Sequence, residues 1–546
     1  CNCSKYNNKR GDGFRPNSGF ESHHAYAHIG YQLSAKTQLT AELTYLYYLA
    51  QQAGGLTDVQ FDLDPTFSNR TRNWFSVDWL LYSARLEHRF SSATNASLQF
   101  FGLDAARKAV GFRTNRVSQV DDLSSPRDLL IGEFNNWGLE GRLLHRYTLG
   151  GKRAIWLIGS KWYSSENTAL QGPGTNSSAA DFSLATEFTS NYAFQSDFQF
   201  PNRNLALFSE NIFYLNDRLS ITPGLRYEYI RTRSDGTFRS LDRDLAGNVI
   251  RDSLFVDQQD FARNILLAGV GMSYQPRPEL EIYANFSQNF RSVTFSDIRI
   301  VNPSDQIDPN ISDERGFTAD VGIRGQTNAF VYELNAFGLL YDDRLGEVIR
   351  PRTRITPAGE EVEVPGLLVR WRGNIGGAFI FGLESLFDWN LLHKRNTEGS
   401  TSPYRLNYFL NLAVAQSEYF RSEIPNVVGK QVEFIPLVNL KTGLRFGWKN
   451  LLGSLQFTYL SEQFTDATNA PRDRNDNLRG IIGSIPAYAL ADLSLSYQFK
   501  KWLKLEAGAN NLTNEQYFTR RATGYPGPGI SPSEPRTFYC TIGVSW

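Results

Sequence analysis

The feature that most constrains this chain is an alternation of apolar and polar residues that recurs in segment after segment. In the last ten residues, TFYCTIGVSW, every even position from Phe538 to Trp546 is apolar, and the odd positions form a more polar set. The same period recurs at 280–290 and at 491–499. Successive side chains of a strand point to opposite faces, so this period predicts strands with one apolar and one polar face. We find no convincing amphipathic helix.

The pattern predicts nineteen strands joined by connections of two sizes. The predicted strands are 20–33, 38–48, 73–90, 95–106, 135–147, 153–164, 204–214, 219–231, 261–275, 279–290, 316–326, 329–342, 372–389, 403–419, 432–447, 453–464, 485–499, 502–512 and 536–546. The short connections are 34–37, 91–94, 215–218, 276–278, 327–328 and 500–501. The long connections are 49–72, 107–134, 165–203, 232–260, 292–315, 343–371 and 513–535.

Short turns at one end and long loops at the other are typical of a bacterial outer-membrane barrel. No apolar run approaches the roughly 18 residues that a membrane helix needs, which excludes a helical membrane protein. The mean hydropathy of −0.38 does not exclude a barrel, because alternating strands average to a polar-looking chain. A large soluble all-β protein is the alternative, but it gives no reason for sorted connections. We therefore predict an all-β fold, a transmembrane antiparallel up-and-down β-barrel.

The strand count indicates that strands are missing from the beginning. Nineteen is odd, whereas bacterial single-chain barrels have even numbers of strands. The residues CNCSKYNN precede a loop-like segment and look like the outer end of an earlier strand. Adding that strand and one hairpin before it gives twenty-two, the size of plugged outer-membrane transporters. A chain that lacks its N-terminal part also explains this start better than a lipid-bearing Cys1 does.

Several stretches resemble the TonB-dependent receptors, and within them the ferric-dicitrate-receptor-like group. These stretches are GDGFRPNSGF at 11–20, QAGGLTDVQFDLDPTFSNRTRNWF at 52–75, FPNRNLALFSENIF at 200–213, LSITPGLRYE at 219–228 and GANNLTNEQYFTRRATGYPGPGISPSEPRTFY at 508–539. The resemblance implies that residues 1–546 are the barrel domain, and that the plug, its TonB box and the first strands are absent. It also implies that the last strand closes the barrel against the first one and marks the chain for outer-membrane assembly.

The resemblance further implies a place and a set of partners. The place is the outer membrane of a Gram-negative bacterium. The implied partners are a ferric chelate, outer-membrane lipid and lipopolysaccharide, and the TonB–ExbB–ExbD complex acting through the plug. We expect a monomer with no cofactor of its own, since iron arrives only as chelated substrate. The formal net charge of zero gives no reason to expect a nucleic-acid partner.

No catalytic or metal-binding motif stands out, so we predict no enzyme. The chain has no G-x-S-x-G elbow, P-loop or H-E-x-x-H. The six histidines are scattered, and His23 and His24 point to opposite faces of one strand. DRNDNLRG at 473–480 has the acidic alternation of a calcium loop but carries Leu478 where the sharp-turn glycine belongs, which favours a solvated loop.

The segment RPRTR at 350–354 could bind an anion, but the sequence offers it local partners. TPAGE reads as a turn, and a single hairpin register would pair Arg354 with Glu361 and Arg352 with Glu363. We therefore favour a loop hairpin with cross-strand ion pairs over a ligand site here.

Loop cations without an obvious local partner are better candidates for binding a carboxylate-rich ligand. Planar guanidinium groups suit such anions, and neutral side chains could add hydrogen bonds. The candidates are Arg70, Arg72, Arg113, Arg116, Arg520 and Arg521, with Gln52, Asn73 and Tyr525 as neutral donors. The alternative for each arginine is a solvated or lipopolysaccharide-facing charge.

Together these observations predict a receptor that captures a ferric chelate, such as ferric dicitrate or a similar siderophore, and imports it with energy from TonB. A passive porin is the main alternative from another class. TonB-dependent uptake of another nutrient, such as a cobalamin or an oligosaccharide, would need the same barrel with different loops. An outer-membrane enzyme ranks third.

Overall fold

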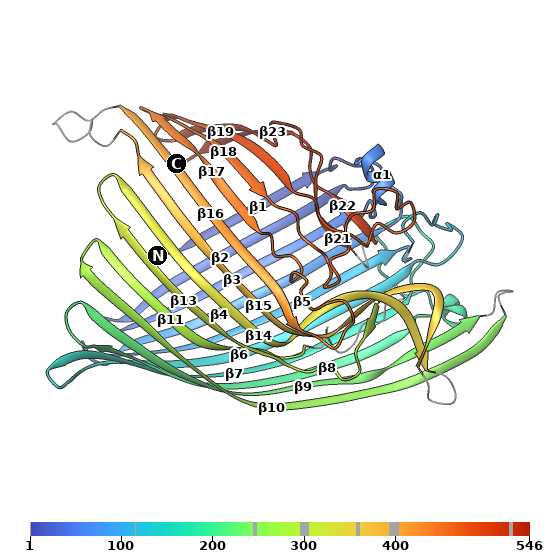
Figure 1. The fold of residues 1–546 in the computed structure, drawn as a ribbon, viewed down its shortest axis with the longest axis horizontal. Helices are drawn as coiled ribbons and strands as arrows, with labels where there is room; N and C mark the ends of the chain where they lie inside the picture. The colour runs from blue at the N-terminus through green and yellow to red at the C-terminus, as the bar shows by residue number, and fades with distance from the viewer. Residues whose placement is uncertain are drawn as a thin grey trace.

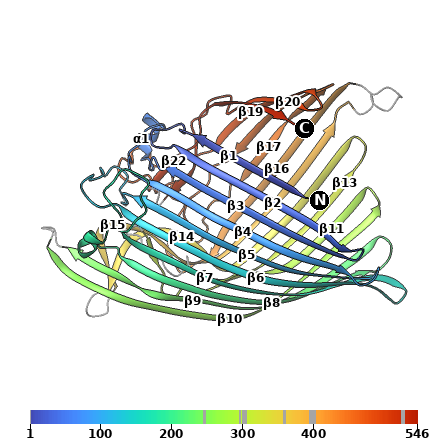
Figure 2. The ribbon, with the colours of Figure 1, turned by 180° about the vertical axis from the view of Figure 1, so that it is seen from behind.

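The computed structural model describes residues 2–114, 116–243, 248–294, 297, 305–355, 361–392, 403–522 and 528–545. One 21-stranded sheet curls into a barrel wall, in which each long strand pairs antiparallel with the next along the chain (Figures 1 and 2). Short turns lie at one end of the wall. The connections at the other end carry α1 and the separate β21–β22 hairpin, and we call it the long-loop end.

Long strands make up nearly all of the regular structure. The strands are β1 (Cys3–Gly11), β2 (Phe20–Ser34), β3 (Thr37–Gln51), β4 (Trp74–Arg89), β5 (Thr94–Gly111), β6 (Asp128–Leu149), β7 (Lys152–Pro173), β8 (Ser196–Tyr214), β9 (Leu219–Arg243), β10 (Val249–Arg277), β11 (Leu280–Arg291), β12 (Asp305–Ile307), β13 (Glu314–Gln326), β14 (Phe330–Ile355), β15 (Glu361–Asn390), β16 (Tyr404–Arg421), β17 (Val438–Trp448), β18 (Leu451–Leu460), β19 (Tyr488–Lys500), β20 (Leu503–Asn510), β21 (Phe518–Ala522), β22 (Gly529–Pro532) and β23 (Thr537–Val544). The helices are α1 (Asp58–Leu63) and the 3-10 turn η1 (Thr186–Asn191).

All nineteen predicted strands are confirmed, and β1 is the earlier strand that CNCSKYNN indicated. The predicted bounds fail at the long-loop end, where pairing continues far into four of the predicted loops. β15 has 30 residues and β10 has 29, well beyond the roughly 9–11 that a membrane crossing needs. Continued pairing satisfies the backbone polar groups of these hairpins outside the membrane thickness. The sequence pattern also missed β12, which pairs parallel with β15, and the small elements α1, η1, β21 and β22.

The two faces of the wall differ as the alternation predicted. Large apolar side chains such as Leu98, Phe100 and Leu139 are exposed on one face, which is the lipid-facing side of a membrane barrel. The opposite, polar face carries ion pairs two residues apart on one strand. Arg85 Nη2 lies 2.6 Å from Glu87 Oε1, and Lys504 Nζ lies 2.5 Å from Glu506 Oε1. Such a face suits a hydrated lumen.

Glycines in the strands lie under aromatic rings of a neighbouring strand. A Cβ added at Gly159 would meet the Phe208 ring at 2.4 Å, and one at Gly508 would meet the Tyr539 ring at 2.5 Å. The ring covers the backbone that the missing side chain exposes, and this pins the strand register. These glycines therefore leave the space in which the aromatic side chains pack against the backbone.

The first and last strands each have one partner in the described structure. β1 pairs with β2 and β23 with β20, and no pairing joins β1 to β23 among the described residues. Trp546 and Cys1 lie outside the described residues. No helix in the part of the chain that is described has the length and apolarity needed to cross a membrane.

Candidate ligand-binding site at the long-loop end

Loops far apart in the sequence dock together at the long-loop end. Leu56 and Ile530 exchange both backbone hydrogen bonds, at 2.9 and 2.7 Å, and so join the β3–β4 connection to β22. α1 begins directly after this bridge, because Thr57 caps it. The Thr57 hydroxyl accepts from the Gln60 N–H, and the Gln60 side chain accepts from the Thr57 N–H, a capping box. The first turn of α1 is thereby fixed against β22.

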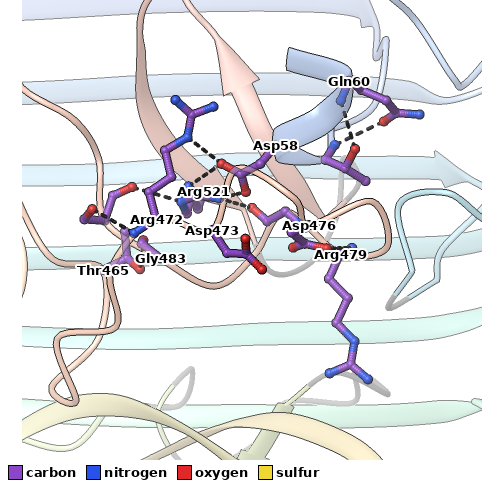
Figure 3. A network of polar contacts seen from close by, with 12 residues as sticks. Asp58, Gln60, Thr465, Arg472, Asp473, Asp476, Arg479, Gly483 and Arg521 are labelled. Carbon is purple, nitrogen blue, oxygen red and sulfur yellow. Dashed lines mark hydrogen bonds and ion pairs between the residues drawn. The ribbon is translucent and has the colours of Figure 1, made fainter. Parts of the chain in front are cut away.

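A fully buried carboxylate holds this helix to two other segments (Figure 3). Arg521 of β21 donates two hydrogen bonds to the Asp58 oxygens, at 2.7 and 2.8 Å, and both side chains are 0% exposed. Arg472, from the connection between β18 and β19, donates to Asp58 Oδ1 at 2.6 Å and to Asp62 Oδ1 at 2.7 Å. Bidentate arginine–carboxylate pairs are strong and directional. Three segments are thus fastened at one point.

An apolar cluster lies beneath this polar network. We call Leu56, Phe61, Ile485, Phe518 and Ile530, together with the Asp58 network, the first loop cluster. The Phe61 and Phe518 rings meet edge to face at 5.1 Å, and the Arg472 guanidinium lies over both rings. The docking of α1 and β21 therefore combines buried apolar area with charge-assisted hydrogen bonds.

The Arg72 side chain is likewise hydrogen-bonded to other groups of the protein. Its guanidinium donates to both Asp121 oxygens, at 2.8 and 2.7 Å, and to the carbonyls of Asp122 and Ser125. Its relative exposure is 1%. Arg72 and Arg521 thus have no partner nearby in the sequence, as predicted, but each meets a carboxylate contributed by a distant segment. Both arginines serve to order the loops.

Arg70 and Asn73 are also buried against backbone. Arg70 donates to the carbonyls of Asn69 and Gln119 and lies over the Phe112 ring at 5.0 Å. Burial lowers the pKa of the Arg70 guanidinium. Asn73 accepts from the Phe112 N–H at 2.8 Å and is 1% exposed. Neither side chain reaches the solvent, so neither contributes to an accessible site in this conformation.

Arg116 and Arg520 remain accessible. Both are exposed, and in the described structure neither guanidinium is hydrogen-bonded or ion-paired. Arg113 is half-buried; its backbone N–H donates to Asp128 Oδ2 at 2.9 Å, and its charge also acts on that carboxylate. The half-buried Gln52 makes a backbone bond to Asn73. Tyr525 lies outside the described residues.

The acidic segment Asp473–Gly480 forms a loop stabilised by its own backbone. The Asp476 carboxylate accepts from the N–H groups of Leu478, Arg479 and Gly480, at 2.9, 3.0 and 2.7 Å. Figure 3 shows the Arg479 side chain directed away from Asp58. No group of three or more potential metal ligands occurs in the described part of the chain. The geometry agrees with the loop interpretation of this segment.

The predicted hairpin at 350–363 exists, but its register is shifted by one residue. Thr353 lies opposite Glu363, and Arg354 lies opposite Val362. The predicted pairing of Arg354 with Glu361 and Arg352 with Glu363 is therefore wrong. A register irregularity between Pro351 and Thr353 shifts the pairing, which alternation within a short turn segment cannot foresee.

A second buried cluster lies across the long-loop end and was missed by the sequence reasoning. Its apolar members are Val348, Trp371, Ile375, Ala378, Ile380, Tyr419, Val427, Val432 and Ala467, and we call them the second loop cluster. The Tyr419 hydroxyl donates to Glu433 Oε2 at 2.7 Å, and Arg344 Nη2 lies 3.7 Å from Glu433 Oε1. Burial raises the pKa of Glu433 despite this arginine. The cluster's members come from β14, β15, β16 and the connections after β16 and β18, and only their packing in the fold brings them together.

A barrel wall with one polar face, short turns at one end and docked loops at the other defines the class of outer-membrane receptor barrels. The family model that matches is the TonB-dependent-receptor-like β-barrel, over residues 25–512. The chain belongs to this family.

Solved structures share the fold at low sequence identity. The ferric citrate transporter FecA in its unliganded form matches with a TM-score of 0.76 and 19% identity, over 99% of this chain and 72% of that one. The ferric yersiniabactin uptake receptor FyuA from Yersinia pestis matches with a TM-score of 0.71 and 13% identity, over 99% and 74%. Both are transport proteins by description, and at these identities the likeness concerns the fold.

Curated relatives cover only part of the chain. The hemoglobin-haptoglobin utilization protein B of Neisseria meningitidis serogroup A is 23% identical over 328 residues, which are 57% of this chain. The matched region spans 38% of that relative's length.

Proposed function

We propose that this chain is the ligand-binding and pore-forming barrel of an outer-membrane receptor that captures a ferric chelate and imports it with energy relayed by TonB. Family membership supports TonB dependence, and the polar inner face supports passage of a hydrophilic ligand. The observation that carries the proposal is the long-loop end of this wall, where docked loops expose unpaired arginines. No bond of the ligand is broken, because the protein supplies binding and a path.

Ferric dicitrate is the first substrate to test. Citrate complexes present carboxylates, and a planar guanidinium can bind a carboxylate through two parallel hydrogen bonds. Arg116 and Arg520 are the exposed donors, and the half-buried Arg113 lies three residues from Arg116. The fold likeness to a ferric citrate transporter agrees with this choice.

A haem-iron source is the second candidate, favoured by the partial match to hemoglobin-haptoglobin utilization proteins. The passive porin is disfavoured by the family to which the chain belongs. Growth separates these substrates. A strain lacking the whole gene should lose growth on ferric dicitrate as sole iron source and keep growth on hemoglobin. Loss of growth on hemoglobin alone would instead support the haem candidate, and undiminished growth on both would refute iron uptake by this receptor.

A further inference from the structure

One connection touches both buried clusters at the long-loop end. Residues 461–487, between β18 and β19, contribute Ile485 to the first loop cluster and Ala467 to the second. We call residues 461–487 the bridging loop. Ile485 is 1% exposed and Ala467 is 0% exposed, so each is fully packed within its cluster.

A polar clamp accompanies each of these apolar contacts. On the first side, Arg472 bonds Asp58 and Asp62, and the Gly480 carbonyl accepts from Arg521 at 2.9 Å. Next to the second loop cluster, the Asn469 side-chain amide pairs with the backbone of Gln431, as a strand backbone would. Its Oδ1 accepts from the Gln431 N–H at 2.7 Å, and its Nδ2 donates to the Gln431 carbonyl at 2.8 Å.

The Ala467 N–H, two residues before Asn469, donates to the Glu347 carbonyl of β14 at 3.0 Å. Asn469 and Arg472 are only three residues apart, so the two clamps adjoin.

The bridging loop is also cross-linked within itself. Gln463 and Ile485 exchange backbone hydrogen bonds at 3.0 and 2.8 Å, and the Thr465 hydroxyl donates to the Gly483 carbonyl at 2.9 Å. The Ser484 hydroxyl donates to Glu462 and accepts from the Arg472 N–H. Thr465 is 3% exposed and Ser484 is 0% exposed. A loop braced in this way moves as a unit, because local opening must break several buried bonds together.

From this arrangement we propose that the bridging loop couples the two loop clusters into one cooperative unit, so that loosening either cluster loosens the other. Arg472 and Asn469 are the positioning residues for the two sides. The coupling does not depend on which ligand the receptor takes. A ligand that contacts either cluster would change the stability of both, since coupling between two sites is reciprocal.

Hydrogen exchange on the full-length receptor in detergent micelles tests this coupling. In the first cluster the amides of Leu56 and Ile530 report, because they are bonded to each other across the docked loops. The Phe61 amide also reports, because it donates to the Thr57 carbonyl within the docked helix α1. In the second, the amides of Tyr419 and Gly429 report, because they are bonded between the end of β16 and the β16–β17 connection. Amides in loop 174–195, which no hydrogen bond joins to the bridging loop in the described structure, serve as the internal reference.

The two substitutions act on opposite sides. Arg472→Gln removes the charge facing Asp58, and Asn469→Gly removes the clamp on Gln431. The φ of Asn469 is +54°, a value that glycine adopts freely, so this change removes the side chain without backbone strain. Arg474→Gln is the matched control, because Arg474 is 76% exposed and lies 3.8 Å from Asp62.

Each substitution should speed exchange about tenfold or more in the cluster it touches and about threefold or more in the other cluster. The Arg474→Gln control should leave both clusters unchanged. The double variant should show less than the sum of the two single effects, since both break one shared unit. Acceleration confined to the directly contacted cluster for both variants would overturn the coupling. If Arg472→Gln fails to assemble, the effect of Asn469→Gly on the first cluster decides alone.

Discussion

The buried carboxylate Asp58 gives the sharpest test of how the loops are held. Asp58→Asn keeps the shape of the side chain but removes the charge that faces Arg521 and Arg472. Arg521 would then be a fully buried cation with no carboxylate partner. Removing one partner of a buried ion pair typically costs about 3–5 kcal/mol, mainly because the other charge stays desolvated. The barrel wall is not involved, so the cost should fall on the first loop cluster.

That cost translates directly into local opening. With about 1.4 kcal/mol for each factor of ten, this cost of about 3–5 kcal/mol should raise the open population of the first loop cluster by about two to four powers of ten. Amide exchange of the full-length receptor at Phe61 and Ile530 measures this population. Asp62→Asn is the control, since Asp62 has 34% side-chain exposure and such pairs contribute about 0–1 kcal/mol. Equal acceleration by both substitutions would refute the assignment of Asp58 as the anchor.

Three further predictions concern other parts of the long-loop end. Gly480→Ala should detach the bridging loop from the β3–β4 connection. The φ of Gly480 is +63°, and an added Cβ would lie 2.2 Å from the Leu56 carbonyl oxygen. Faster amide exchange at Leu56 would show this detachment, and an unchanged rate would contradict it. Glu433 has a raised pKa, so its protonation stabilises the second loop cluster fully below the ordinary value of 4.5, and this contribution is lost as pH rises through the folded pKa. Exchange at Tyr419 should therefore speed up with rising pH beyond the intrinsic chemical rate, and Glu433→Gln should remove that extra dependence; a persisting dependence would assign it to another group. Arg116→Ala should weaken ferric dicitrate binding about ten- to a hundredfold by titration calorimetry, with only partial rescue by lysine, whereas an unchanged affinity would remove Arg116 from the site.

The strands were predictable because alternation and connection length are local properties of the sequence. The pattern even marked β1, through a segment that preceded the first predicted strand. It underestimated β10 and β15 because these hairpins continue beyond the roughly 9–11 residues that a membrane crossing needs, where one apolar lipid-facing side is no longer required. Glycines that lie under aromatic rings, such as Gly159 under Phe208, indicate which residues of neighbouring strands are paired. The alternation alone does not use this information.

The candidate site was less predictable because its organisation depends on pairs that are distant in sequence. Asp58 and Arg521 are 463 positions apart, and Arg72 and Asp121 are 49 apart. The presence of arginine in the loops was informative, since several of these arginines do bind carboxylates. The partner could not be inferred, however, because docking of separate loops decides it. For the same reason Arg72 and Arg521 are buried against carboxylates, while Arg116 and Arg520 are exposed.

Uptake of radiolabelled ferric dicitrate by whole cells tests the proposed function most directly. Cells lacking the whole gene, complemented with the full-length gene, should show saturable uptake that an uncoupler of the proton gradient abolishes. Complementation with the Arg116→Ala, Arg520→Ala double variant should restore an assembled receptor but lower uptake at limiting substrate by about tenfold or more. Uptake that persists without the gene, or that rises linearly with concentration and ignores the uncoupler, would contradict an energised receptor for this chelate.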